Sequence, residues 1–187
     1  MMQALKSIIK KILHKNTDSE IEYLKKRGLR IGEKVDIFSP YCFDSLYPGL
    51  ITVGNCVTIS SNVKILAHDA SMGYVCSGAC KIGIVSIGNN VFIGHGATIL
   101  CNTRIGDNVI IGAGSVVSGD IPSGSVYAGN PARFIKTTEA FQKQHENSIA
   151  THPTTTRPWR EFRDLPDDEW SKLRSQLKDT YGYVVRK

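Results

Sequence analysis

The residues best suited to acid–base chemistry in this chain are its five histidines, because an imidazole exchanges protons near neutral pH. His68 stands out by its position, directly after a run of regularly spaced aliphatic residues that ends at Ile65. His95 lies between two glycines, in a short segment of the same regular region. His68 is therefore the first candidate for a general base and His95 the second. We expect the other three at the surface, outside the regular region: His14, His145 and His152.

A repeat with a period of six residues positions both candidates and runs from residue 51 to residue 121. Aliphatic residues recur at one phase, and apolar or small residues recur four positions later. Six fits neither an α-helix nor a long alternating strand. It predicts a short strand and a corner, three per coil, with coils stacked about 4.8 Å apart. The predicted inward columns are Val53, Ile59, Ile65, Ile87, Ile93, Ile99, Ile105, Ile111 and Val117, and Val57, Val63, Val91, Ala97, Thr103, Val109, Ser115 and Ile121.

The repeat is interrupted between Ile65 and Ile87. These positions are 22 residues apart, which is not a multiple of six, so a loop must leave the coil here. Loops that project from a rigid scaffold often carry function. His68 follows the last regular strand, so the edge of the scaffold is expected to hold it in place.

The repeat resembles the hexapeptide-repeat acyltransferases, the left-handed parallel β-helix family, and most of all its maltose/galactoside and polysaccharide O-acetyltransferases. The resemblance covers roughly residues 28–137. It rests on Ile-Gly-Asn-Asn-Val-Phe-Ile-Gly-His-Gly-Ala-Thr-Ile at 87–99, on Ile-Gly-Asp-Asn-Val-Ile-Ile-Gly-Ala-Gly-Ser-Val-Val at 105–117, and on Val-Tyr-Ala-Gly-Asn-Pro-Ala-Arg-Phe-Ile-Lys at 126–136. It implies a mainly β fold, a left-handed parallel β-helix with a protruding loop and helices at both ends.

The resemblance implies an acetyl-CoA-dependent O-acetyltransferase that modifies a carbohydrate hydroxyl, which we place in surface polysaccharide biosynthesis. In this family a histidine at the start of such a loop deprotonates the acceptor hydroxyl, and His68 matches it. Asp69 is the candidate for binding the acceptor or orienting the ring. The segment from Phe38 to Pro48, with four aromatic residues and Asp44, is a weaker candidate for the sugar site.

The resemblance also implies which residues bind the acetyl-CoA cosubstrate. His95 matches a position near the thioester, although a purely structural corner histidine is the alternative. Where relatives often carry a lysine after Ser118, this chain has Gly119. The basic pair predicted at the nucleotide phosphates fits phosphate chemistry. The predicted cofactor-binding residues are His95, Gly112, Ala113, Ser118, Arg133 and Lys136.

Two other functions remain open: an N-acetyltransferase acting on a nucleotide-linked amino sugar, and a non-catalytic β-helix scaffold. A zinc site of the kind found in the carbonic anhydrases of this fold needs a second histidine five residues after the first. Leu100 follows His95 at that distance and Gly73 follows His68, so we predict no metal. The five cysteines form no convincing zinc pattern and are expected to be reduced thiols.

The charge composition indicates which kinds of binding partner the protein favours. The net charge is +6 with a pI near 9.1, which favours anionic partners, but no nucleic-acid-binding motif occurs. No secretory signal and no spanning segment are expected, so we predict a cytoplasmic protein, with a peripheral position at the inner membrane surface as the alternative. The resemblance implies a homotrimer with sites between subunits.

The flanks of the repeat are expected to be helical. We divide the chain into an N-terminal helical segment (1–27), the β-helix acyltransferase domain (28–137) and a C-terminal helical extension (138–187). An amphipathic basic helix over 4–13 is expected to pack on the protein or, alternatively, to dock on an anionic membrane surface. Further helices are predicted at 18–27, 138–150 and 167–179, with a polar linker or extended arm at 151–158.

Overall fold

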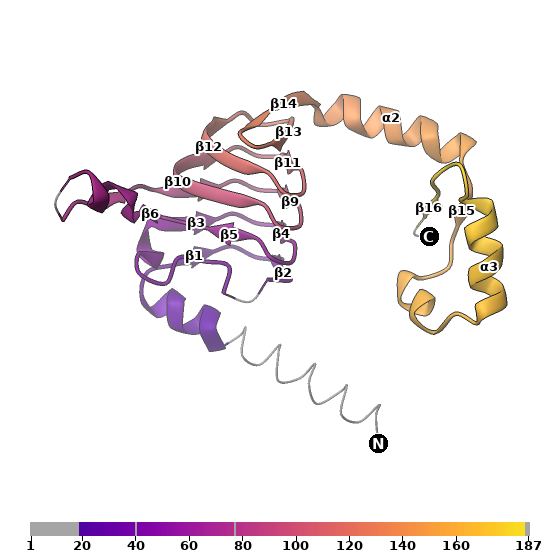
Figure 1. The fold of residues 1–187 in the computed structure, drawn as a ribbon, viewed down its shortest axis with the longest axis horizontal. Coiled ribbons are helices and arrows are strands. Elements are labelled where there is room, and N and C mark those ends of the chain that lie inside the picture. The colour runs from indigo at the N-terminus through magenta and orange to yellow at the C-terminus, as the bar shows by residue number, and fades with distance from the viewer. Residues whose placement is uncertain (1–18, 40, 77, 186–187) are drawn as a thin grey trace, which may run out of the picture. The chain divides into compact units, whose positions relative to one another are not determined.

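The protein is described here by a computed structural model, which covers residues 19–39, 41–76 and 78–185. These residues form two compact units, one ending at Thr138 and one beginning at Glu139. The first is a stack of short strands and the second a small, mainly helical unit (Figure 1). The amphipathic helix predicted over residues 4–13 lies outside the described part of the chain. None of the helices in that part is long and apolar enough to cross a membrane.

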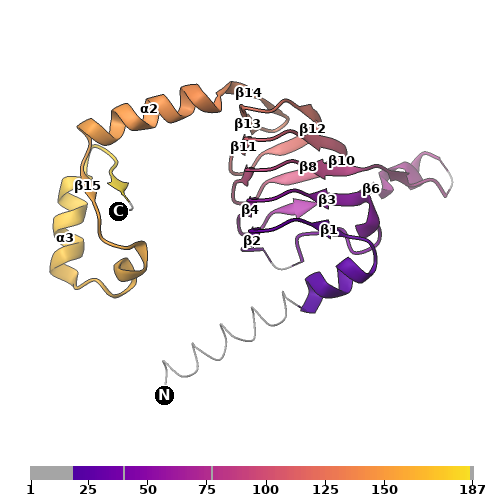
Figure 2. The same cartoon turned by 180° about the vertical axis from the view of Figure 1, so that it is seen from behind.

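The strands of the first unit stack turn upon turn, as the six-residue period predicts (Figures 1 and 2). Their backbone hydrogen bonds join them into two mainly parallel sheets around one core. Strand β10 turns a corner: Thr98 and Ile99 pair with β5, whereas Thr103 to Ile105 pair with β8. Each turn of the chain therefore has three sides. The left-handed sense of the coil stays a prediction from the resemblance. The first sheet contains β1 (Arg30–Ile31), β3 (Ile51–Val53), β8 (Val85–Ile87), β10 (Thr98–Ile105) and β12 (Val116–Ile121), with β5 (Lys64–Ile65) on β10. The second contains β2 (Asp36–Ile37), β4 (Thr58–Ile59), β9 (Phe92–Ile93), β11 (Ile110–Ile111), β13 (Ser125–Gly129) and the antiparallel closing strand β14 (Ala132–Thr137).

The two predicted inward columns form the core. Every residue of both columns is at most 5% exposed, so the periodic interpretation is confirmed residue by residue. Two of these positions are polar, and each is satisfied. Thr103 Oγ1 donates to the Val117 carbonyl at 3.5 Å, and Ser115 Oγ accepts from Gly129 N at 3.1 Å. Burying a polar group costs little when it has such a partner.

The strand register locates the interruption. Val85 pairs with Thr103, 18 residues later, which is one complete turn of three six-residue segments. Ile51 pairs with Val85, 34 residues later, so this turn carries 16 additional residues. They form the protruding loop predicted between Ile65 and Ile87 (Figures 1 and 2).

A ladder of side chains runs along one corner of the coil. The oxygen of a polar side chain in each turn accepts a hydrogen bond from a backbone N–H of the preceding turn. Glu33 N donates to Asn55 at 2.8 Å, Asn55 N to Asn89 at 2.8 Å, Asn89 N to Asp107 at 2.6 Å, and Asp107 N to Ser123 at 2.9 Å. This corner ladder satisfies N–H groups that a tight turn would otherwise leave unpaired.

In the described part of the chain, helices precede and follow the strands of the first unit in sequence. Residues 19–26 are helical, and Gly28, at φ +103°, ends the helix in a conformation that suits glycine. In the second unit, α2 spans Thr138–Thr151 and α3 spans Asp167–Gln176, three residues shorter than predicted. The predicted linker contains a short strand, β15 (Thr154–Thr155), which pairs with β16 (Tyr183–Val184). A six-residue 3-10 helix, η3 (Trp159–Asp164), lies between β15 and α3.

Candidate active site

The protruding loop begins as a hairpin that carries the predicted base. Strand β6 (His68–Asp69) pairs antiparallel with β7 (Lys81–Ile82), opposing His68 to Ile82 and Asp69 to Lys81. A 3-10 helix, η2 (Ala70–Tyr74), follows β6. The backbone just before the hairpin is tied to the next turn, since Leu66 N donates to the Ile99 carbonyl at 2.9 Å. The scaffold therefore fixes His68 at the root of the loop.

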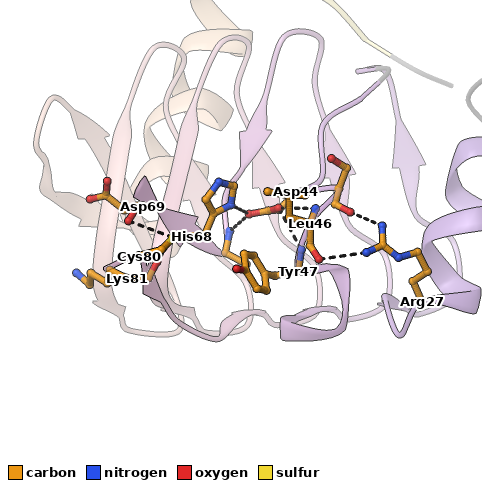
Figure 3. Close-up of polar contacts among 10 residues, drawn as sticks. Arg27, Asp44, Leu46, Tyr47, His68, Asp69, Cys80 and Lys81 are labelled. Carbon is orange, nitrogen blue, oxygen red and sulfur yellow. Dashed lines mark hydrogen bonds and ion pairs between the residues drawn. The ribbon is translucent and has the colours of Figure 1, made fainter. Parts of the chain in front are cut away.

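His68 is held by a carboxylate from the preceding turn, that of Asp44 (Figure 3). Asp44 Oδ2 bonds to His68 Nδ1 and accepts from Ala67 N at 2.9 Å. The other oxygen, Oδ1, accepts from Leu46 N at 2.9 Å and Tyr47 N at 3.2 Å. An ionised carboxylate only accepts, so the imidazole proton is assigned to Nδ1. That assignment leaves the lone pair of Nε2 free to take a proton.

The surroundings of Asp44 keep its carboxyl group ionised. The side chain is 1% exposed, and this burial on its own would raise the pKa. The hydrogen bonds from His68, Ala67, Leu46 and Tyr47 outweigh that effect and hold the pKa of Asp44 below its usual value. A negative charge therefore remains beside the imidazole across the neutral range.

The imidazole is also packed against an aromatic ring. The rings of Tyr47 and His68 lie 5.5 Å apart, centroid to centroid, at an interplanar angle of 55°. The His68 side chain is 26% exposed, so one part of it remains accessible. Asp44 and Tyr47 thus fix the ring from two directions without closing it off.

A cavity of about 420 Å³ opens beside His68. The loop and two later turns of the coil contribute to its wall, through Asp69 from the loop, Leu100 from β10 and Ser118 from β12. Ser118 is one of the predicted cofactor-binding residues, and it lies in the same cavity as the predicted base. The complete lining is Leu66, His68, Asp69, Ala70, Lys81, Leu100, Cys101 and Ser118.

Asp69 has a structural role that the sequence did not reveal. Its Oδ1 accepts from Ser71 N at 2.9 Å and so caps η2. The hydrogen bonds from Ser71 lower the pKa of Asp69 below its usual value. The residue lines the cavity, as an acceptor-binding role requires, but one of its oxygens is engaged within the loop.

The other predicted cofactor-binding residues lie away from this cavity in the single chain. His95 occupies the turn between β9 and β10, and its Nδ1 bonds to Ser61 Oγ at 2.8 Å. Gly112 and Ala113 occupy the corresponding turn one coil later, where Gly114 N donates to the His95 carbonyl at 2.8 Å. Arg133 and Lys136 lie on the closing strand β14. The fold thus separates these residues into two groups. The corner group is His95, Gly112 and Ala113, and the end group is Arg133 and Lys136.

Asp44 has a contact that the sequence pattern does not predict. It lies in the segment that is the weaker candidate for the sugar site, and its carboxylate contacts the imidazole of His68 directly. The sequence holds one sign of this role: Asp44 lies three residues before Tyr47 and four before Pro48. This pattern is typical of a turn that an aspartate side chain caps. Among the described residues, no group of three or more His, Cys, Asp or Glu side chains is placed to hold a metal ion.

Comparisons with known proteins point in one direction. The family model described as "Bacterial transferase hexapeptide (six repeats)" matches residues 84–119. The chain is 34% identical over 120 residues to "Putative acetyltransferase YvoF" of Bacillus subtilis, covering 64% of this chain and 67% of that one. It is 37% identical over 143 residues to "Protein CapG" of Staphylococcus aureus, covering 74% and 81%. A solved galactoside acetyltransferase in complex with coenzyme A matches at 29% identity and a TM-score of 0.52, covering 67% of this chain and 73% of that one.

Proposed function

The chain belongs to the hexapeptide-repeat transferase family, and from this premise we propose that it transfers an acetyl group from acetyl-CoA to a carbohydrate hydroxyl. The observation that carries the proposal is the Asp44–His68 pair beside a cavity that Ser118 also lines. A histidine in the correct tautomer, next to an accessible cavity, is what deprotonation of an acceptor hydroxyl requires.

The residues that line the cavity suit the reacting end of acetyl-CoA. Leu66, Leu100 and Ala70 supply apolar wall suited to an acetyl thioester, while Ser118 supplies a hydroxyl. The similar galactoside acetyltransferase was solved with coenzyme A, which supports the same cosubstrate here. In our proposal the remainder of the cosubstrate is bound by the corner group and the end group, which are His95, Gly112, Ala113, Arg133 and Lys136. The separation of the corner group from the cavity accords with sites shared between subunits of a homotrimer.

His68 performs the proton transfers in this scheme. Its Nε2 accepts the hydroxyl proton as the acceptor oxygen bonds to the acetyl carbonyl carbon. His68 then returns this proton to the sulfur of coenzyme A as the carbon–sulfur bond breaks. Asp44 keeps the proton on Nδ1 throughout and stabilises the imidazolium while it exists, since a carboxylate bonds more strongly to a charged donor.

The acceptor is proposed to be a sugar hydroxyl because the similar solved enzyme acts on a galactoside. We propose that the protein acts in surface polysaccharide biosynthesis, in the cytoplasm or at the inner membrane surface. Acetylation of an amino sugar would use the same base but a different acceptor group. A panel of matched hydroxyl and amino sugars distinguishes these outcomes.

The test is release of free thiol from acetyl-CoA, measured over that panel with the intact protein. We expect His68→Ala to lower kcat at least about a hundredfold, as removal of a general base does. His95→Ala is the matched comparison: it should raise the KM for acetyl-CoA more than it lowers kcat. Nearly full activity in His68→Ala would reassign the base, with His95 next. A scaffold without activity would show neither thiol release nor a thermal shift with millimolar acetyl-CoA.

A further inference from the structure

Arg27 reaches from the N-terminal helix to the segment that carries Asp44. The helix at residues 19–26 is anchored by Leu24, which is 1% exposed, and Arg27 N donates to the Leu24 carbonyl at 3.0 Å. The Arg27 guanidinium bonds to two successive carbonyl oxygens, with Nη1 on Ser45 and Nη2 on Leu46 at 3.2 Å (Figure 3). The guanidinium carbon lies 5.6 Å from the centre of the Tyr23 ring, which contacts it by a cation–π interaction.

These two carbonyls belong to the same peptide groups that hold the carboxylate. The carbonyl of Ser45 shares a planar peptide with the N–H of Leu46, and the carbonyl of Leu46 shares one with the N–H of Tyr47. Both of these N–H groups donate to Asp44 Oδ1. Each peptide is therefore fixed at both ends, by Arg27 on its oxygen and by Asp44 on its nitrogen.

This arrangement couples a surface cation to the imidazole. A hydrogen bond to a carbonyl polarises its peptide and strengthens the N–H as a donor. Arg27 thus strengthens two of the bonds that orient Asp44, and the other oxygen of Asp44 orients His68. The planar guanidinium has two donors spaced for adjacent acceptors, which a lysine ammonium does not reproduce.

We propose that Arg27 is a positioning residue for the Asp44–His68 pair, acting through the Ser45–Leu46 and Leu46–Tyr47 peptides. The proposal rests on the proposed function in so far as the pair is catalytic. It makes Arg27 responsible for the orientation and tautomer of His68, and gives it no contact with either substrate.

The first test is a kinetic double-mutant cycle. Arg27→Ala should lower kcat roughly three- to tenfold, about the worth of one neutral hydrogen bond, with the KM for acetyl-CoA unchanged. In an Asp44→Asn background the same change should have almost no further effect, because residues that act through one another are not additive. Arg27→Lys should fall between wild type and Arg27→Ala. Lys25→Ala is the matched control, since Lys25 lies on the same helix and its ammonium pairs with the exposed Glu22 at 3.0 Å.

The second test does not depend on turnover. Nitrogen-15 NMR of labelled histidine reports which ring nitrogen of His68 carries the proton. Wild type and Lys25→Ala should show the Nδ1–H tautomer, and Arg27→Ala should show a mixture. If Arg27→Ala retains the wild-type tautomer and kcat, or if its kinetic effect multiplies fully with that of Asp44→Asn, the proposal is wrong. An inactive wild-type protein with the expected NMR shift would refute the proposed function alone.

Discussion

Replacing Asp44 by asparagine tests the central geometry of the site, because the change is nearly isosteric yet exchanges one acceptor for a donor. In the native protein both carboxylate oxygens accept, each from two N–H donors. The amide of asparagine has only one oxygen. Its NH2 group must therefore face either the Leu46 and Tyr47 amides or the Ala67 amide and the imidazole.

Each orientation has a different consequence for the base. With the NH2 toward Leu46 and Tyr47, two part-buried hydrogen bonds lose their acceptor, which costs at most about 1–3 kcal/mol each. With the NH2 toward His68, the imidazole must accept at Nδ1, so its proton moves to Nε2 and the ring is no longer a base. Both orientations remove the negative charge that stabilises the imidazolium. A charged hydrogen bond contributes about 1.5–3 kcal/mol, so we expect kcat to fall about 10- to 150-fold.

The assay is thiol release from saturating acetyl-CoA and acceptor, with circular dichroism to verify that the variant is folded. Asp120→Asn is the matched control, since Asp120 is 77% exposed and pairs with Arg104 at 3.7 Å on another part of the coil. The control should keep wild-type kcat. A folded Asp44→Asn variant within about threefold of wild type would refute the assigned role of the carboxylate.

Two further predictions concern stability. The pKa of Asp44 is depressed in the folded state, so its stabilising contribution is present above the unfolded pKa of about 3.9 and is lost as pH falls through the lower folded value. In urea denaturation, the stability difference between wild type and Asp44→Asn should therefore shrink below about pH 4, and a constant difference down to pH 3 would contradict this. In the corner ladder, Asn89→Ala removes the acceptor of Asn55 N and the donor to Asp107 at 3.0 Å, and should lower the free energy of unfolding by about 1–2 kcal/mol. Unchanged urea unfolding would show that water replaces these bonds at no cost.

The regular part of the fold was predictable because its signal repeats. Nine aliphatic positions in one phase, and eight apolar or small positions in the other, specify the same inward columns that the structure buries. The break in phase between Ile65 and Ile87 also indicates the loop, since insertions within a repeat form loops on one face of a solenoid.

The partner of His68 was not predictable in the same way. Phe43 pairs with Ile65, 22 residues later, so the first turn is four residues longer than the regular 18. No periodic signal fixes how these extra residues are accommodated. Without that register, the sequence does not show that Asp44, 24 residues before His68, lies beside it. The pairing within the predicted linker or extended arm at 151–158 is not predictable for a related reason, because the partner strand, Tyr183–Val184, is distant in sequence.

The corner ladder has a consequence for how the chain is made. In every rung the acceptor belongs to the later segment, so Asn55 N waits for Asn89, and Asn89 N for Asp107. A ribosome delivers 18 residues in about one to four seconds. During synthesis the newest turn therefore keeps an unpaired corner N–H group until the ribosome has delivered the next turn.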